Sequence, residues 1–203
     1  MIRLVIKRIL FFLGIVLSLP FIVPTILEAA LFGEKCERML CWCKEILSLI
    51  PTAIGEYMRL GFYWSVCSEI SPDALFMFGS MVAHRDTIIR AGVVVGSYTI
   101  VGYADIGENV LMGARVSLIS GKYQHGRPVE RSGGAELVEQ YDTIHIGKNS
   151  WIGQDAIIMA NVGENCTVGA GSVVFKDMPP NSTFIGNPAR KVNIESGPWI
   201  KEN

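Results

Sequence analysis

The feature that most constrains this chain is a six-residue period in its second half. From residue 89 onward an aliphatic residue recurs at about every sixth position, usually followed by glycine and then by a small or aliphatic residue. A fixed internal period indicates a repeat architecture, in which each unit contacts its neighbours along a stack. The units are IRAGVV, VGSYTI, VGYAD, IGENVL and MGARVS, then, after an interruption, IGKNSW, IGQDAI, IMAN, VGENCT, VGAGSV and VFKDMP.

Six residues suffice for one short strand and one turn, so three units close one triangular coil of a parallel β-helix. The aliphatic residue at the first position then points into the prism and stacks on its equivalent in the next coil. The glycine beside it tolerates the tight corner. The sequence therefore predicts a mainly β chain, with a β-helix over residues 70–192 and a short tail at 193–203.

The first 33 residues form a hydrophobic segment of membrane type. Residues 9–27 carry no charge, which is long enough to cross a bilayer. Arg3, Lys7 and Arg8 precede this stretch and place the N-terminus on the cytoplasmic side. A simple span would then put everything after residue 33 outside the cell.

Two prolines offer a second arrangement for this segment. Pro20 and Pro24 each remove a backbone donor and disfavour a straight helix. They favour a re-entrant hairpin that returns to the cytoplasmic face, with its bend sheltered by protein. A cleaved signal peptide is a third, weaker interpretation, because no clear small-x-small cleavage site follows the apolar run. We therefore expect a protein of the inner membrane whose folded domain faces the cytoplasm.

Residues 34–69 are predicted to be helical and amphipathic. Pro51 divides them, with the second helix running from about Thr52 to Cys67. The apolar stripe either packs against the periodic domain or lies at a membrane interface, where tyrosine and tryptophan are favoured. The stripe is Met39, Leu40, Trp42, Cys43, Ile46, Leu47 and Ile50, and the later aromatic residues are Tyr57, Phe62, Tyr63 and Trp64.

Charge and cysteine content exclude some functional classes. The net charge of −1 gives no sign of nucleic-acid binding. The five cysteines are scattered, and Cys41-Trp42-Cys43 lacks a second Cys/His pair at zinc spacing. We expect free thiols in a reducing compartment and no metal cofactor.

Four pieces of the C-terminal half follow one another in a recognisable order and spacing. They are Ile146-Gly147-Lys148-Asn149-Ser150-Trp151-Ile152-Gly153, Gly169-Ala170-Gly171-Ser172-Val173-Val174, Lys176-Asp177-Met178-Pro179 and Gly186-Asn187-Pro188-Ala189-Arg190. In these pieces, and over roughly residues 75–192, the chain resembles the hexapeptide-repeat acyltransferases. It looks like the branch with the galactoside, maltose and polysaccharide O-acetyltransferases. The resemblance implies a left-handed parallel β-helix, a homotrimer, acetyl-CoA as co-substrate and sites in the clefts between subunits.

The interruption of the period is the predicted active-site loop, residues 120–143. Loops of about 24 residues inside a regular domain are usually functional or disordered. Attack of a hydroxyl on a thioester requires a base, and imidazole titrates near working pH. His125 lies where the resembling enzymes carry their catalytic histidine, after the Ser-Gly that ends a coil, although Lys-Tyr-Gln intervenes here. We expect His125 to be the base, against a surface histidine as the alternative.

The other two histidines are weaker candidates. His145 precedes Ile146 on a strand, so alternation predicts that it faces outward. His84 lies in an early coil, where it could approach a neighbouring subunit's site. Solvated or partly packed side chains are the default expectation for both.

The resemblance also implies where coenzyme A binds. An extended pantetheine arm can bond exposed backbone beside small residues, and its phosphates need cations. Trp151 either lines the acyl or pantetheine channel or packs between subunits. The expected cofactor-binding residues are Trp151, Gln154, Ala170, Gly171, Lys176 and Arg190.

The acceptor is the least specified part of the expected reaction. Tyr123, Arg127 and Arg115 could contact a sugar, but an asparagine that sugar acetyltransferases carry in an earlier coil has no clear counterpart. A membrane segment on such an enzyme favours a saccharide acceptor assembled at membrane lipids, as in polysaccharide biosynthesis. We therefore expect a membrane-associated, acetyl-CoA-dependent O-acetyltransferase acting on a polysaccharide or lipid-linked glycan precursor.

Three other functions were weighed on the same residues. Acetylation of a small soluble acceptor, such as an antibiotic or amino acid, fits the repeats but not the membrane segment. A non-catalytic trimeric membrane scaffold fits the segment but not the loop histidine. A γ-type carbonic anhydrase would need three zinc-binding histidines, and the chain's three lack the close pair of that family.

Overall fold

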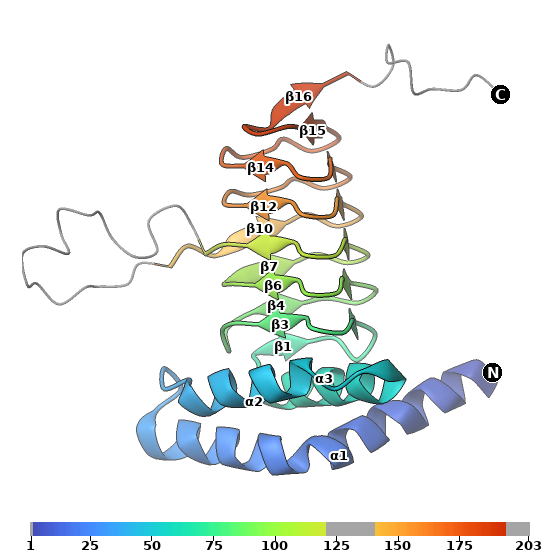
Figure 1. Cartoon of the computed structure of the whole chain (residues 1–203), viewed down its shortest axis with the longest axis vertical. Coiled ribbons are helices and arrows are strands. Elements are labelled where there is room, and N and C mark those ends of the chain that lie inside the picture. The colour runs from blue at the N-terminus through green and yellow to red at the C-terminus, as the bar shows by residue number, and fades with distance from the viewer. Residues whose placement is uncertain (1, 121–140, 194–203) are drawn as a thin grey trace, which may run out of the picture.

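The computed structural model describes residues 2–120 and 141–193. These residues form a left-handed parallel β-helix that stands as a column on a layer of three helices (Figure 1). The predicted fold class is confirmed. Coil stacking gives the long axis of the molecule, and the helices lie across its N-terminal end.

Three parallel sheets form the sides of the column. The first sheet contains β1 (Glu69–Ile70), β4 (Ile88–Ile89), β7 (Ala104–Ile106) and β10 (Ile144–Ile146). The second contains β2 (Leu75–Phe76), β5 (Val94–Val95), β8 (Leu111–Met112), β11 (Trp151–Ile152), β13 (Thr167–Val168), β15 (Thr183–Ile185) and β16 (Arg190–Val192). The third contains β3 (Met81–Val82), β6 (Ile100–Val101), β9 (Ser117–Leu118), β12 (Ile157–Ile158) and β14 (Val173–Val174).

The aliphatic first residue of each unit fills the inside of the column. Each of these side chains is at most 3% exposed, because equivalent residues stack in register along every sheet. One further coil, formed by Ile70, Phe76 and Val82, precedes the period that begins at residue 89, and its units lack the glycine after the inward residue. The inward residues of the later coils are Ile89, Val95, Val101, Ile106, Met112, Leu118, Ile146, Ile152, Ile158, Val162, Val168 and Val174.

Two of the three corners have the same length in every coil. From the first to the second sheet, and from the second to the third, inward residues are always six positions apart. Except at Asp73 in the first coil, the fourth residue of each such unit has a left-handed backbone, which glycine and asparagine adopt most readily. We call these the first and second corners. Their left-handed residues are Gly92, Asn109, Asn149, Asn165 and Asn181 at the first, and Gly79, Tyr98, Arg115, Asp155 and Gly171 at the second.

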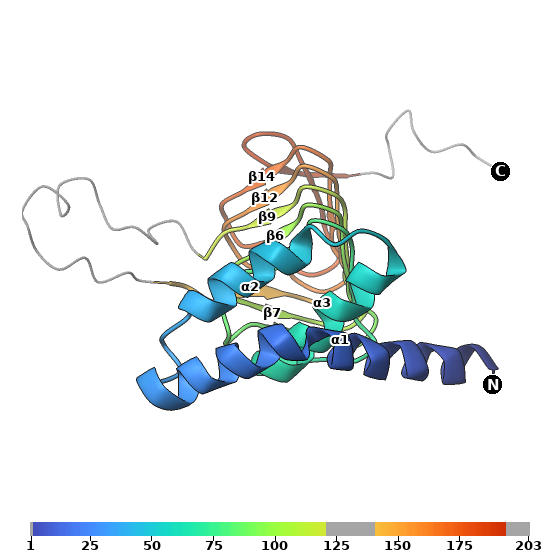
Figure 2. The same ribbon diagram turned by 60° about the horizontal axis from the view of Figure 1, so that its bottom comes forward.

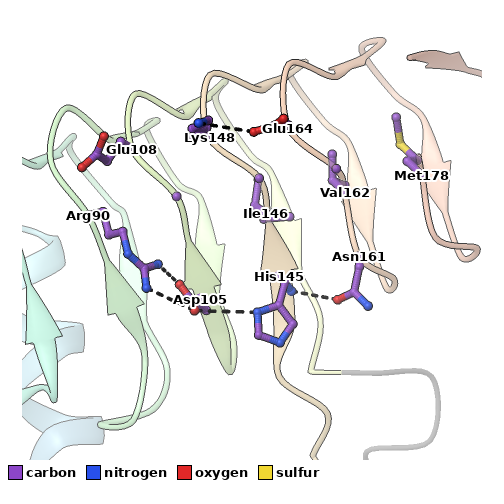
Figure 3. Close-up of a pocket in the computed structure, with 13 residues that line it drawn as sticks. Arg90, Asp105, Glu108, His145, Ile146, Lys148, Asn161, Val162, Glu164 and Met178 are labelled. Atoms are coloured by element: carbon purple, nitrogen blue, oxygen red, sulfur yellow. Dashed lines mark hydrogen bonds and ion pairs between the residues drawn. The ribbon is translucent and has the colours of Figure 1, made fainter. Parts of the chain in front are cut away.

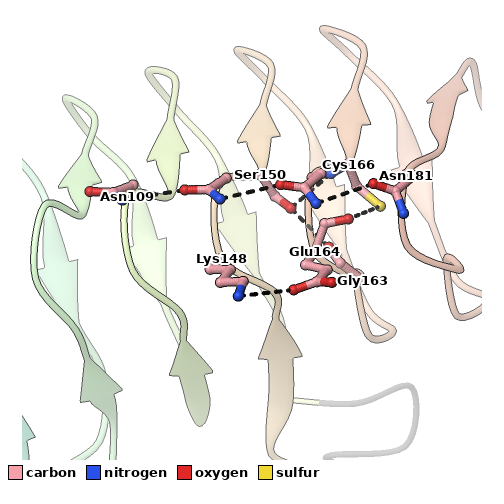
Figure 4. Close-up of polar contacts among 9 residues, drawn as sticks. Asn109, Lys148, Ser150, Gly163, Glu164, Cys166 and Asn181 are labelled. Carbon is pink, nitrogen blue, oxygen red and sulfur yellow. Dashed lines mark hydrogen bonds and ion pairs between the residues drawn. The ribbon is translucent and has the colours of Figure 1, made fainter.

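The asparagines of the first corner form a ladder along the column (Figure 4). Each Nδ2 donates to the Oδ1 of the next coil, at 3.3 Å from Asn109 to Asn149 and 3.2 Å from Asn149 to Asn165. The ladder ends on Asn181. Asparagine therefore suits this turn for two reasons: its backbone adopts the left-handed conformation readily, and its side-chain amide bonds to the neighbouring coils.

The third corner, from the third sheet back to the first, varies in length. Successive inward pairs there are Val82 and Ile89, Val101 and Ile106, Leu118 and Ile146, Ile158 and Val162, and Val174 and Met178. The intervals therefore range from four to 28 residues. We call this the variable corner; its segments are residues 83–88, 102–105, 119–145, 159–161 and 175–177.

The N-terminal layer consists of α1 (Ile2–Phe32), α2 (Arg38–Ser48) and α3 (Thr52–Val66). Figure 2 shows the three helices from below, with α1 crossing the base of the column. Contrary to the hairpin expected from Pro20 and Pro24, α1 runs continuously through both prolines. It packs along α3, and Ser18 Oγ donates to Met58 O at 2.9 Å between the two helices.

A buried arginine joins this layer to the first coil. Arg59 on α3 is fully buried and donates to the carbonyl oxygens of Leu47, Ile50 and Phe76. Burial lowers the pKa of its guanidinium. The helices and the column therefore share polar contacts as well as an apolar core.

Candidate functional site

Two of the three histidines belong by sequence to segments of the variable corner, His84 to 83–88 and His125 to 119–145, whereas His145 lies on β10 of the adjoining first sheet. His125, the predicted base, lies outside the described residues, as do Tyr123 and Arg127. The described residues at and beside this corner carry two polar clusters.

The first cluster is built on His84. Its Nδ1 lies 2.9 Å from Glu37 Oε2, and Glu37 Oε1 accepts a hydrogen bond from the Arg85 backbone amide at 2.7 Å. Burial raises the pKa of Glu37, but the hydrogen bonds and charges of His84 and Arg85 outweigh it, and the net shift is downward. An ionised carboxylate only accepts, so His84 Nδ1 carries the proton of this hydrogen bond.

Two tyrosines continue this cluster up the corner. The His84 ring stacks on Tyr103 with centroids 4.0 Å apart, and Tyr141 lies 4.9 Å from the same ring. His84 and Tyr141 also line a cavity of about 320 Å³ together with Ser120 and the outer side of the third sheet. Ser120 and Tyr141 flank residues 121–140, so this cavity lies where the predicted loop leaves and rejoins the column.

The second cluster lies around the corner, on the first sheet (Figure 3). Arg90 forms an ion pair with Asp105, and His145 Nδ1 lies 3.7 Å from Asp105 Oδ2. The His145 backbone amide donates to Asn161 Oδ1 at 2.9 Å. His145 is exposed between buried Ile144 and Ile146, the outward orientation that strand alternation predicts. These residues line an open cavity of about 630 Å³.

Several predicted cofactor residues lie on the second corner. Gln154 and Gly171 are stacked on consecutive coils, joined by a hydrogen bond from Gly171 N to Gln154 O at 2.8 Å. Ala170 precedes Gly171, and all three are exposed. A Cβ on Gly153 would lie 2.5 Å from Ala170 N, so glycine is needed for the coils to approach here. We call Gln154, Ala170 and Gly171 the second-corner column.

Arg115 belongs with this column and not with the variable corner. Its Nε and Nη2 donate to the two carboxylate oxygens of Asp155 at 2.6 and 2.8 Å. The hydrogen bond from Arg115 lowers the pKa of Asp155. The predicted sugar contact of Arg115 therefore lies at a different corner from the segment that contains Tyr123 and Arg127.

The remaining predicted cofactor residues are dispersed. Trp151 points outward from β11 and is 53% exposed. Lys176 lies on the variable corner in the last full coil, with its Nζ 5.8 Å from the Phe175 ring centroid. Arg190 is exposed on β16. All three are on the outer surface of the C-terminal half.

Sequence reasoning missed Glu37, Tyr103 and Tyr141 as site residues. Glu37 lies 47 positions from His84, and nothing local in the sequence links them. The tyrosines do carry a signal, because both lie in segments where the six-residue interval fails. Within the described residues no group of three histidine, cysteine, aspartate or glutamate side chains is arranged to hold a metal ion.

Comparisons with known proteins agree with this geometry. A family model described as bacterial transferase hexapeptide (six repeats) matches residues 143–176. A Schizosaccharomyces pombe protein whose name describes it as an acetyltransferase is 36% identical over 180 residues, covering 79% of this chain and 84% of that protein. Galactoside O-acetyltransferase of Escherichia coli K12 is 35% identical over 130 residues, 61% of this chain and 59% of the relative.

The fold also matches solved structures. A maltose O-acetyltransferase from Clostridium difficile 630 superposes with a TM-score of 0.57, covering 77% of this chain and 84% of that chain. Its identity of 24% makes this a likeness of fold.

Proposed function

Because this chain belongs to the hexapeptide-repeat family of acetyltransferases and is an acyltransferase, we propose that it is an acetyl-CoA-dependent O-acetyltransferase acting on a saccharide at a membrane. The observation that carries this proposal is that the second-corner column and the His84 cluster lie at opposite edges of the third sheet. The second-corner column borders one edge of that sheet, and the variable corner borders the other.

The proposed reaction is a direct transfer with no acyl-enzyme. His125 accepts the proton of an acceptor hydroxyl while the hydroxyl oxygen attacks the thioester carbonyl carbon. The carbon–sulfur bond then breaks, and the proton held by His125 passes to the sulfur of coenzyme A as it leaves. Holding both substrates against one sheet supplies proximity, which replaces a covalent intermediate.

Coenzyme A would lie along the second-corner column. Exposed backbone at Ala170 and Gly171 suits a pantetheine arm, and Gln154 adds a side-chain amide on the coil below. Lys176 and Arg190 would hold phosphates as the exposed cations of the last coils. Trp151 would cover the acyl end from β11.

A saccharide acceptor and a homotrimer complete the proposal. The galactoside enzyme among the relatives is named for a sugar, and Tyr123, Arg127 and the tyrosines beside His84 are side chains that suit sugar rings and hydroxyls. Second-corner residues are exposed in one chain and would be enclosed by a neighbour in a trimer. The acceptor class we favour is a polysaccharide or lipid-linked glycan precursor.

The proposed location is the cytoplasmic side of the inner membrane. Residues 5–32 form a helix with a mean hydropathy of 2.5, of which only 28% is buried. A glycan precursor carried by a membrane lipid would meet an enzyme held at the same surface.

Coenzyme A release and glycan analysis test the proposed function together. Purified full-length protein in detergent is incubated with acetyl-CoA and membrane glycan extracts, and coenzyme A is measured by chromatography. We expect release that depends on the extract and is lost in His125→Ala but kept in His145→Ala. Mass spectrometry of glycans from cells lacking the protein should reveal a missing acetyl group. Near-normal turnover in His125→Ala contradicts the assigned base, and unchanged glycans contradict the acceptor class.

A further inference from the structure

After its N-terminal turns, the polar side chains of α1 face the other helices and apolar side chains face outward, the reverse of a surface helix in a water-soluble protein. Its buried positions facing the other helices include Ser18, Thr25 and Glu28, all at most 8% exposed. Between Ile9 and Phe32 every exposed position is apolar. The exposed apolar side chains are Ile9, Phe12, Leu13, Val16, Leu17, Leu19, Val23, Ile26, Leu27, Leu31 and Phe32, with Pro20 and Ala30 among them.

The polar groups of the inner face are each satisfied within the helical layer. Ser18 Oγ donates to Met58 O, Thr25 Oγ1 donates to Phe21 O, and Glu28 Oε2 accepts from Met39 N at 2.9 Å. The inner face is therefore a complete helix–helix contact and does not need water. A surface helix in water normally shows the opposite pattern, with its apolar stripe inward.

Both ends of α1 are fixed to the same side of the molecule. At its N-terminal end Lys7 Nζ pairs with Asp73 Oδ1 at 2.8 Å, just before β2 in the first coil. At its C-terminal end Glu28 accepts a hydrogen bond from the Met39 amide in the first turn of α2. Between them Gly14 and Gly61 let the backbones of α1 and α3 touch, since a Cβ on Gly14 would lie 2.2 Å from Tyr57 O.

These contacts decide how α1 can meet a bilayer. A helix of 31 residues is about 46 Å long, more than the roughly 30 Å hydrocarbon core, so length alone permits a span. A span, however, would carry the charged first coil into the hydrocarbon along with one end of α1. A helix lying in the membrane plane keeps both ends and the column in water.

We propose that the outer face of α1 is a bilayer-binding surface, with the helix lying in the membrane interface and the column rising from it toward the water. This deepens the membrane location in the proposed function and rests on it. The surface continues onto α3 through a shallow apolar groove lined by Leu10, Leu13, Leu17 and Ile54.

Aromatic and basic side chains border this surface in the manner of an interfacial helix. Trp64 on α3 lies edge-on to Phe11 at 5.5 Å, and Trp42 on α2 is 60% exposed. Arg8 near one end of α1, and Lys35 and Arg38 beyond the other, are exposed cations suited to anionic headgroups. Of the charged residues exposed next to this surface, Arg8, Lys35 and Arg38 outnumber Glu34, which favours an anionic bilayer over a second copy that carries the same excess of cations.

Flotation with vesicles tests the surface without acetyl-CoA or an acceptor. Full-length protein is dialysed from detergent with preformed vesicles of equal parts phosphatidylcholine and phosphatidylglycerol. We expect the wild type to float with the vesicles and Val16→Glu/Val23→Glu to bind about 10-fold or more weakly. Ile185→Glu is the matched control, since Ile185 on β15 is 48% exposed against 50% for Val23. Equal loss in this control, or no flotation of the wild type, overturns the proposal.

Labelling from outside the vesicles separates an in-plane helix from a span. Cys36 reports on the C-terminal end of α1, and an Arg8→Cys variant adds a reporter at the other end. A membrane-impermeant maleimide, with modified peptides identified by mass spectrometry, should modify both ends. Protection of one end means a span and overturns the in-plane arrangement. Light scattering in vesicle-free buffer tests whether the protein forms dimers. Dimers that are abolished by Val16→Glu/Val23→Glu would mean that the outer face of α1 binds a second copy of the chain, and would overturn the proposal. If the protein binds vesicles but transfers no acetyl group, the bilayer-binding surface is supported and the proposed activity is contradicted.

Discussion

The first and second corners of the column differ from the variable corner in what their residues do. At the first two, a six-residue interval recurs in every coil and a left-handed fourth residue in every coil from Gly79 onward, and asparagine side chains hold the first corner. At the variable corner the interval ranges from four to 28 residues, and its segments contain His84 and, by sequence, His125. The first and second corners maintain the stacking of the coils, whereas the variable corner can hold functional side chains without disturbing that stacking.

The difference follows from how a β-helix closes. Two corners of constant length keep three strands per coil in register, so one corner can vary without disturbing the stack. The longest interval at that corner, from Leu118 to Ile146, is accommodated without any change in the pairing of β10 with β7 or of β12 with β9. Substitutions at the two kinds of corner should therefore affect different observables.

The largest expected effect comes from changing the length of a regular corner. One alanine inserted between Lys148 and Asn149 shifts the left-handed position and the register of the following strand. We expect it to lower the free energy of unfolding by about 4 kcal/mol or more, measured by urea denaturation followed by circular dichroism. One alanine inserted between Ala160 and Asn161, at the variable corner, should cost about 1 kcal/mol. Equal losses would remove the distinction between the corners.

The next largest effect is a loss of activity that leaves the stability of the protein unchanged. His125→Ala should lower turnover about 100-fold or more, as expected for loss of a general base. The free energy of unfolding should stay within about 0.5 kcal/mol of the wild type, since a loop substitution removes no core contact. Coenzyme A release and urea denaturation measure the two quantities. A loss of stability that accounts for the lost turnover would count against the assignment.

A smaller effect separates backbone strain from side-chain bonding at the first corner. Asn149→Ala removes both ladder contacts and places a Cβ without a polar group at φ +58°. We expect a loss of about 2 kcal/mol in urea denaturation. Asn149→Gly removes the same hydrogen bonds but no longer strains the backbone, so it should cost about half as much. If glycine proves as harmful as alanine, strain does not shape this corner.

The smallest predicted stability effect concerns Glu37. Its folded pKa lies below the unfolded value of 4.5, so its contribution is complete above pH 4.5 and is lost as pH falls below that value. Glu37→Gln should cost about 1 kcal/mol at neutral pH and flatten the decline below pH 4.5. Turnover should stay close to the wild type, because the proposed reaction passes its proton through His125 and not through His84. Glu164→Gln, an exposed carboxylate paired with Lys148, is the control and should leave both curves unchanged.

Sequence periodicity predicted the column because each unit satisfies its own geometry. An aliphatic residue every six positions and a glycine or asparagine at the turn act within one coil, so they are readable without knowing what lies above or below. The first coil was harder to read, since Phe76 and Val82 begin units that lack the glycine. The continuous helix through Pro20 and Pro24 was missed because its stability comes from α3.

The candidate site was less readable for the same reason. Glu37 reaches His84 only because the helical layer folds beneath the first coil, a contact between residues 47 positions apart. Arg115 was grouped with Tyr123 by residue type, although its left-handed turn assigns it to the second corner beside Asp155. Contacts between coils, or between column and base, depend on stacking that no single unit encodes.

The two ends of the column have a consequence for solubility. A stack of parallel strands exposes unpaired backbone at its last coil, which is a template for end-to-end growth into a fibre. Here the lower end is covered by α2 and α3, and at the upper end β16 turns back to pair antiparallel with β15 (Figure 1). That final strand begins with Arg190 and Lys191, so a second column approaching it meets positive charge and a reversed strand direction. The antiparallel strand β16 therefore opposes further stacking of coils, and copies of the chain are kept from polymerising end to end.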